Sequence, residues 1–152
     1  MLRIYTTKDI INDNITKRER IMKALIVDDD CTNRVLLQGL ISKYAEVHVA
    51  VNGSEACDAV QSALDANVPY DLICLDVMMP EMDGHEALNI IREREEKAGI
   101  NLGQGSKIIM ITGRGDSKSI MSSFSQNCDA YLVKPIDKQK LIAELTKLSI
   151  IN

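Results

Sequence analysis

Aromatic side chains are scarce in this sequence, which has no tryptophan and only 3% Phe and Tyr. A surface that stacks nucleic-acid bases needs aromatic side chains, so this composition argues against one. The formal charge is −4 and the pI is about 5.2. Proteins that bind the phosphate backbone usually carry an excess of Lys and Arg. We therefore expect no nucleic-acid partner.

Long apolar runs are also missing, and none approaches the roughly 20 residues that a membrane helix requires. The first residues lack the charged and then apolar order of a secretory signal. The four cysteines, Cys31, Cys57, Cys74 and Cys128, include no C-x-x-C pair. Their placement is typical of reduced, structural thiols. The sequence thus predicts a cytoplasmic protein with no membrane partner.

Hydrophobic residues make up 45% of the chain and cluster in five short, β-branched runs. These runs predict strands that are covered on both faces. They are Lys23–Val27, Val47–Val51, Leu72–Leu75, Ile108–Ile111 and Ala130–Val133. Segments with helical apolar spacing lie between them. The alternation predicts an α/β fold of the (βα)5 type, a doubly wound parallel sheet with the flavodoxin-like order 2-1-3-4-5.

The five predicted helices each carry an apolar stripe. Their members are Leu36, Leu37, Leu40, Ile41 and Tyr44; Ala56, Val60, Ala63 and Leu64; Ala87, Leu88 and Ile91; Ile120, Met121 and Phe124; and Leu141, Ile142, Leu145 and Leu148. Ser54, Asp116 and Asp137 stand at expected N-caps, and Gly84 marks the turn into the third helix. The charged run from Glu93 to Glu96 is interpreted as a solvated helix face.

Residues 1–21 form an N-terminal extension that differs in charge from the predicted domain of residues 22–152. They carry five basic and three acidic residues, a net charge of +2, which leaves −6 for the rest. Two readings of the extension remain open. It forms an arm or an extra helix, or the start is misassigned and translation begins at Met22.

Polar residues follow four of the five predicted strands. The first strand ends in Asp28, Asp29 and Asp30, the third in Asp76, the fourth in Thr112 and the fifth in Lys134. Ligands of open α/β sheets bind at the carboxyl edge, where the strand order reverses between strands one and three. Those two strands supply the aspartates, so we expect these side chains to converge. Asp30 is equally consistent with capping the first helix.

Three neighbouring carboxylates need positive charge. Two carboxylates about 5 Å apart repel by roughly 3 kcal/mol at an effective dielectric constant of 20. Lys134 supplies one positive charge, and a hard divalent cation such as Mg²⁺ supplies two more. Metal, carboxylates, ammonium and hydroxyl around one point stabilise a phosphoryl group in transfer. Asp76 is the expected nucleophile, because aspartyl phosphates are an established form of covalent catalysis.

Four motifs in order resemble the receiver (CheY-like) domain of two-component response regulators. They are VDDD at 27–30, LDVMMPEMDG at 75–84, ITG at 111–113 and YLVKP at 131–135, and the resemblance covers the chain from about Met22. It implies Mg²⁺ binding by Asp28, Asp29, Asp76 and the backbone carbonyl of Met78. It also implies phosphorylation of Asp76, phosphoryl contacts from Thr112 and Lys134, and a cis Lys134–Pro135 bond.

The resemblance further implies a switch. Thr112 and Tyr131 would move together on phosphorylation and alter the surface of the fourth helix, fifth strand and fifth helix, roughly 116–148. Met78 and Arg114 occupy positions that tune the loss of phosphate in this family. A bulky apolar side chain and a long cation there predict a phosphorylated state that outlasts that of fast chemotaxis regulators.

The implied function is a response regulator of the single-domain type, not an enzyme with an external product. A sensor histidine kinase, a histidine phosphotransfer protein or a small acyl phosphate would be the donor, and a downstream protein would read the phosphorylated state. The alternative is a phosphorelay intermediate. We expect a monomer or a weak, phosphorylation-dependent dimer. A haloacid-dehalogenase-type phosphatase is disfavoured because Met78 stands where its second aspartate is required, and the complete acidic set argues against an inert, receiver-like module.

Overall fold

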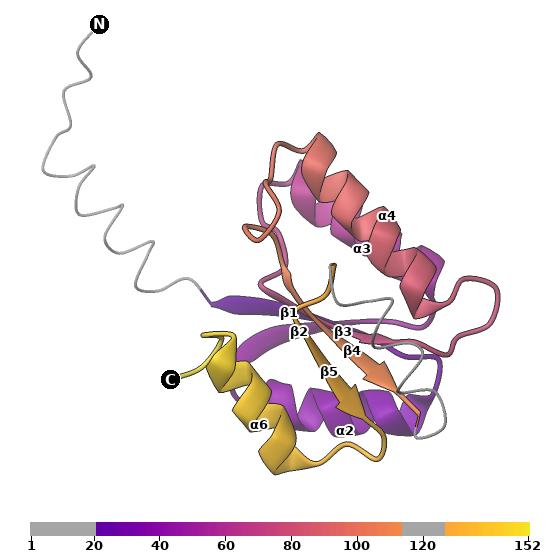
Figure 1. The fold of residues 1–152 in the computed structure, drawn as a ribbon, viewed down its shortest axis with the longest axis vertical. Helices are drawn as coiled ribbons and strands as arrows, with labels where there is room; N and C mark the ends of the chain where they lie inside the picture. Colours follow the sequence, from indigo (N-terminus) through magenta and orange to yellow (C-terminus); the bar gives the residue numbers. More distant parts are fainter. Residues whose placement is uncertain (1–20, 114–126) are drawn as a thin grey trace, which may run out of the picture.

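The computed structural model describes residues 21–113 and 127–152. Strands and helices alternate along the described chain (Figure 1). The elements are β1 (Met22–Val27), α2 (Cys31–Ile41), β2 (Ala45–Ala50), α3 (Gly53–Asp65), β3 (Leu72–Asp76), α4 (Gly84–Lys97), β4 (Lys107–Thr112), β5 (Ala130–Val133) and α6 (Lys138–Lys147). The predicted helix around Ile120, its cap Asp116, and the extension of residues 1–20 lie outside the described residues.

The five strands form one parallel sheet in the order β2-β1-β3-β4-β5, which confirms the predicted α/β fold and strand order. The register aligns the strand ends. Val27 pairs with Leu75 and Asp76 pairs with Ile111. Asp28 therefore emerges beside Asp76, and Thr112 follows on the other side. The sheet order and register together bring Asp28, Asp76 and Thr112 to one edge.

Alternate residues of each strand face two separate cores. One core contains Leu25 and Ile73 and packs against α3 and α4, while the other contains Ile26 and Cys74 and packs against α2 and α6. Figure 1 shows these helix pairs on opposite sides of the sheet. Covering both faces explains why the strands are almost continuously apolar. Among the described residues, no helix combines the length and apolar character needed to cross a bilayer.

Each described helix begins at a side-chain cap, and one predicted cap is wrong. Asp137 caps α6 as predicted, and Asp30 caps α2 by accepting a hydrogen bond from the backbone N–H of Asn33. Asn52, two residues before the predicted Ser54, caps α3 through the backbone N–H of Glu55. Both Asn and Ser cap helices well, so residue type alone did not decide between them.

Two further expectations from the apolar pattern are wrong. Leu36 and Tyr44 are exposed, because α2 buries a narrower face and ends at Ile41. Glu95 is buried within the charged run of α4 that was interpreted as solvated. All members of the second and third apolar stripes are buried, as predicted. Among the described residues, helical spacing thus located the helices correctly but overestimated the width of one buried face.

Candidate functional site

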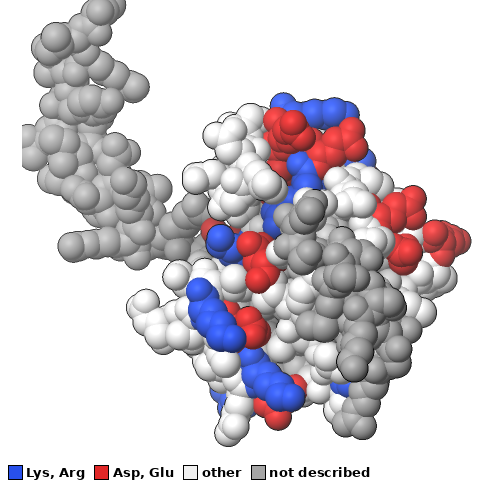
Figure 2. Space-filling view, viewed as in Figure 1, with Lys and Arg blue, Asp and Glu red and all other residues white. Residues whose placement is uncertain are grey.

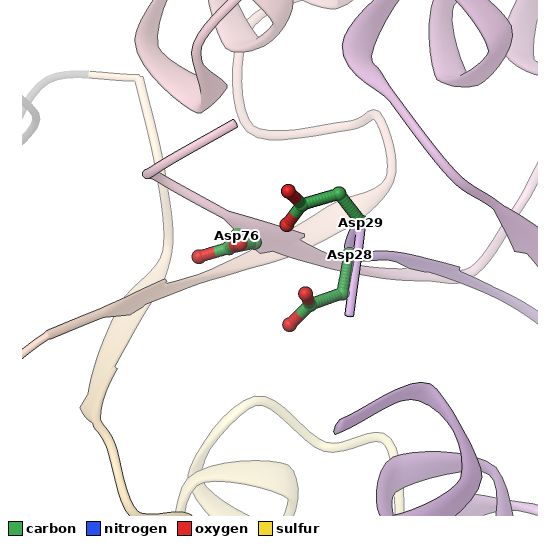
Figure 3. Close-up of side chains that lie close together, drawn as sticks. All are labelled: Asp28, Asp29 and Asp76. Carbon is green, nitrogen blue, oxygen red and sulfur yellow. The ribbon is translucent and has the colours of Figure 1, made fainter. Parts of the chain in front are cut away.

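Three aspartates meet at the carboxyl edge of the sheet. Asp28 and Asp29 directly follow β1, and Asp76 ends β3. One carboxylate oxygen from each lies within 4.8 Å of the other two. Figure 3 shows the three side chains projecting to the same side of the strand ends. The sequence-predicted convergence of these residues is present in the structure.

Lys134 reaches the same cluster from the end of β5. Its Nζ lies 3.1 Å from Asp76 Oδ1 and 3.3 Å from Asp28 Oδ2. Burial alone would lower the pKa of Lys134, but the hydrogen bond and charge of Asp76, together with Asp28, outweigh it and raise the pKa. The ammonium therefore stays charged. The Lys134–Pro135 peptide bond is cis, as expected.

One ammonium does not balance three carboxylates. Asp28 is fully buried and Asp76 is 1% exposed, whereas Asp29 is exposed. Burial raises the pKa of Asp76 to about 6, and the negative charge of Asp28 adds to this while Lys134 opposes it. Asp28 Oδ2, although close to Lys134, has no hydrogen-bond partner among the described residues. The cluster thus retains excess negative charge and an unsatisfied buried acceptor.

These features fit a hard divalent cation. Carboxylate oxygens from three residues are ligands that Mg²⁺ accepts, with water completing the coordination. The unsatisfied oxygen of Asp28 is the kind of acceptor that a metal would engage. Asp28, Asp29 and Asp76 are therefore the residues in the described chain that can hold such an ion together.

The backbone around the cluster is closely fitted. Asp30 N–H donates to Asp28 Oδ1 at 2.9 Å, and Met78 N–H lies 3.3 Å from Asp76 Oδ1. Gly84, the first residue of α4, packs directly on the backbone of Asp76 and Val77, where an added Cβ would collide with the Asp76 carbonyl oxygen. A glycine is required at this close approach.

Of the remaining predicted residues, Thr112 lies at the same edge, Tyr131 lies two residues before the end of β5, and Arg114 lies outside the described chain. Thr112 is fully buried at the end of β4, and its hydroxyl lies 3.3 Å from the Gly113 carbonyl oxygen. Tyr131 on β5 packs against the core beside α4, and burial raises the pKa of its hydroxyl. The Met78 side chain is 59% exposed, two residues beyond Asp76. Arg114 lies outside the described residues.

One residue at the site was not predicted. Arg34, in the first turn of α2, donates from Nη1 to the backbone carbonyl of Asp28 at 2.8 Å. Asp30, which was open between two roles, caps α2 and also donates its N–H to Asp28. An arginine six residues after an aspartate carries no sequence signal for such a contact, because the contact depends on how the turn folds.

The described fold and site define a class of flavodoxin-like α/β domain with an acidic cluster at the carboxyl edge of its sheet, and comparison with known proteins identifies the family. Residues 24–146 match the response regulator receiver domain. The chain therefore belongs to the receiver domain family of two-component response regulators. Receiver domains are phosphorylation-dependent switches rather than conventional enzymes, and they bind Mg²⁺ at an acidic pocket.

Several relatives are named as transcriptional regulatory proteins. The chain is 35% identical over 128 residues to the transcriptional regulatory protein ResD of Bacillus subtilis (strain 168). The aligned region covers 83% of this chain and 47% of ResD. The chain is 33% identical over 125 residues to the transcriptional regulatory protein SrrA of Staphylococcus aureus (strain NCTC 8325 / PS 47). That alignment covers 82% of this chain and 46% of SrrA. The chain thus spans about half the length of these relatives.

Solved receiver domains share the fold over most of the chain. One is the receiver domain of the histidine kinase CKI1 from Arabidopsis thaliana in complex with Mg²⁺ and BeF3⁻. It is 27% identical, with a TM-score of 0.71 over 89% of this chain and 95% of that chain. The chemotaxis protein CheY4 of Vibrio cholerae is 25% identical, with a TM-score of 0.69 over 84% and 98%.

Proposed function

We propose that this chain is a signalling switch that accepts a phosphoryl group on Asp76. The observation that carries the proposal is the convergence of Asp28, Asp29 and Asp76 within 4.8 Å, with Lys134 Nζ 3.1 Å from Asp76 Oδ1. Carboxylates, an ammonium and a nearby hydroxyl are the groups that phosphoryl transfer requires. The family supports the same chemistry.

In the proposed reaction, an oxygen of the Asp76 carboxylate attacks the phosphorus of the donor. With a phosphohistidine donor from a sensor kinase or a phosphotransfer protein, an O–P bond forms as the P–N bond breaks. The imidazole leaves with the bonding electron pair and takes a proton from solvent. Lys134 would balance charge on a phosphoryl oxygen, and the Thr112 hydroxyl would donate to another.

A divalent cation is needed because the three carboxylates carry more negative charge than Lys134 balances. Asp28, Asp29 and Asp76, with the backbone carbonyl of Met78, would hold Mg²⁺. When bound, Mg²⁺ supplies the positive charge that lowers repulsion between the Asp76 carboxylate and an incoming phosphoryl group. Hydrolysis of the acyl phosphate at the same residues would return the domain to its resting state.

The output is proposed to be a change in protein surface. Thr112 at the end of β4 and Tyr131 on β5 would shift together. The surface of the predicted helix around Ile120, which lies outside the described residues, together with β5 and α6 would then bind a downstream protein. Tyr131 on β5 is partly buried against the core that α3 and α4 cover, so a change in its position would also alter the surface around β5. On the face shown in Figure 2, acidic and basic side chains are interspersed.

A phosphorelay intermediate is the second candidate. The similar CKI1 structure is the receiver domain of a histidine kinase, and receivers within kinases are a natural place for onward transfer. Incubating the phosphorylated chain with a histidine phosphotransfer protein separates the two. Rapid, stoichiometric transfer to the histidine would favour the relay, and retention on Asp76 would favour the switch.

Mass spectrometry after incubation with acetyl phosphate and Mg²⁺ tests phosphorylation. We expect a gain of one phosphoryl group in the wild type, and none in Asp76→Ala or with EDTA. Asp137→Ala is the matched control, because Asp137 also follows a strand but caps α6. It should be phosphorylated normally. If the wild type gains no phosphoryl group from either acetyl phosphate or a phosphorylated kinase, the proposal is contradicted.

The lifetime of the phosphorylated state tests the roles of Met78 and Arg114. Met78 follows Asp76 by two residues and its side chain is exposed. An apolar group that covers the acyl phosphate would exclude attacking water. The double variant Met78→Asn with Arg114→Glu should therefore lose phosphate faster, by about tenfold if the barrier falls by about 1.4 kcal/mol. The decay of the phosphorylated mass after removal of acetyl phosphate measures this rate. An unchanged rate would contradict these roles.

A further inference from the structure

The turn between β1 and α2 carries two of the three carboxylates and is held at several points. Asp28 N–H donates to the Ala50 carbonyl oxygen at 3.2 Å, and Asp28 Oδ1 accepts from Asp30 N–H at 2.9 Å. The carbonyl oxygen of Asp28 accepts a 2.8 Å hydrogen bond from Nη1 of Arg34. That carbonyl belongs to the peptide linking Asp28 to Asp29, so its orientation determines how both side chains leave the turn.

Arg34 uses its charge differently from the other arginines of the described chain. No carboxylate among the described residues lies within ion-pair distance of Arg34, and the side chain is only partly exposed. Its guanidinium is instead directed at one backbone carbonyl. A hydrogen bond from a charged donor is shorter and stronger than one between neutral groups, so it can fix a short turn.

We propose that Arg34 is a positioning residue for the acidic cluster. Its hydrogen bond to the Asp28 carbonyl fixes the peptide between Asp28 and Asp29, and thereby sets the affinity of the cluster for a divalent cation. This inference rests on the proposed function, because it assigns a role to Arg34 in the same site. Residues that orient metal ligands typically change metal affinity by about 10–100-fold when they are replaced.

Charge and position predict opposite outcomes, which makes the inference testable. A guanidinium near the cluster repels a cation, so a purely electrostatic Arg34 would weaken Mg²⁺ binding, and its neutralisation would tighten it. A positioning Arg34 does the reverse. Its replacement loosens the turn, lets the Asp28 and Asp29 carboxylates spread, and weakens Mg²⁺ binding.

The experiment is a titration of the full chain with Mg²⁺, in which binding is measured by isothermal titration calorimetry. The free energy of unfolding is measured in parallel. Arg34→Lys keeps the charge but loses the planar, two-pronged donor, and Arg34→Gln removes the charge. We expect both to raise the Kd for Mg²⁺ by about tenfold. At saturating Mg²⁺ the phosphorylation rate of Arg34→Lys should approach that of the wild type, since only metal affinity is impaired.

Arg94→Lys and Arg94→Gln are the matched controls. Arg94 Nη1 also donates to a backbone carbonyl at 2.8 Å, that of Cys57, between α4 and α3. These variants should leave the Kd for Mg²⁺ within about twofold of the wild type, because Arg94 orients no metal ligand. They report any general effect of losing an arginine-to-carbonyl hydrogen bond.

Each outcome decides the role of Arg34. Wild-type binding with an unchanged or lower Kd in Arg34→Gln would overturn the inference and leave the proposed function intact. A Kd raised equally by the Arg94 variants would also overturn it, by showing that the effect is not local. A wild-type chain that binds no Mg²⁺ but is phosphorylated would overturn the positioning role without touching phosphorylation at Asp76.

Discussion

Two charged clusters lie at opposite ends of the sheet, and they differ in how completely their charges are compensated. At the end where β4 and β5 begin, Arg92 lies 2.7 Å from Glu95 Oε1 and 3.0 Å from Asp129 Oδ2. Its guanidinium also donates to the carbonyl oxygens of Ser106 and Asn127. Glu95 is 4% exposed and accepts from the Ser106 N–H at 2.7 Å.

The cluster at the carboxyl end is organised differently. Lys134 faces two buried carboxylates, and a third lies within reach. One oxygen of Asp28 lacks a hydrogen-bond partner among the described residues, and the pKa of Asp76 is raised. In the Arg92 cluster each charged group has a partner. In the Asp28–Asp29–Asp76 cluster the negative charge exceeds the positive charge that Lys134 supplies.

The difference separates a structural use of charge from a functional one. A buried charge that is fully paired fixes the chain around it, whereas an undercompensated group is free to engage a ligand at some cost in stability. Removing a charge from each cluster should therefore have opposite effects on the free energy of unfolding in the absence of metal.

The largest effect is expected at the Arg92 cluster. Glu95→Ala leaves Arg92 without its closest carboxylate and the Ser106 N–H without an acceptor. Breaking a buried pair in this way costs about 3–5 kcal/mol. Urea denaturation should show this loss, while the exposed neighbour Glu96→Ala changes stability by less than about 0.5 kcal/mol. A loss below about 1 kcal/mol in Glu95→Ala would contradict the proposed structural role.

The second prediction concerns the pH dependence of the undercompensated cluster. Because the pKa of Asp76 is about 6 in the folded protein, higher than its unfolded value of about 4, the folded state binds more protons between these values. The stability that this carboxyl contributes is present below about pH 4 and is lost as the pH rises through 6. Two pKa units correspond to no more than about 3 kcal/mol.

Asp76→Asn removes this titration. In EDTA, the variant should be more stable than the wild type at pH 7, and the difference should shrink towards pH 4. Urea denaturation of both proteins across this range measures it. Added Mg²⁺ should stabilise the wild type and have little effect on the variant. A variant that is less stable than the wild type at pH 7 in EDTA would show that the carboxylates are already compensated.

The two clusters also differ in how far the sequence predicted them. Asp28, Asp76, Thr112 and Lys134 each follow an apolar run, and parallel strands place such residues at one edge. Their convergence therefore follows from the strand pattern and order, both of which are confirmed. A residue that follows a strand takes its position from the sheet itself.

Residues that depend on loops could not be placed in this way. Glu95 was interpreted as solvated because its neighbours Glu93 and Glu96 are charged and exposed. Its burial depends on the segment between α4 and β4 folding back over it, which periodicity does not reveal. The same holds for Arg34, whose contact depends on the shape of the β1–α2 turn, and for Asn52, which caps α3 in place of Ser54.

The smallest predicted effect compares two glycines, one at each cluster. A Cβ on Gly84 would collide with the Asp76 carbonyl oxygen, and a Cβ on Gly105 would collide with the Glu95 carboxylate. Overpacking at such contacts typically costs about 1–3 kcal/mol. We expect Gly84→Ala to lower the free energy of unfolding more than Gly105→Ala does, because the added Cβ meets backbone atoms at Gly84 and the end of a side chain at Gly105. Only Gly84→Ala displaces the backbone that carries the proposed phosphorylation site. Its phosphorylation by acetyl phosphate should be slower than that of the wild type, while Gly105→Ala, measured under conditions where both are folded, keeps the wild-type rate. Equal slowing in both variants would mean that the rate follows overall stability, and that the two ends of the sheet are not functionally separate.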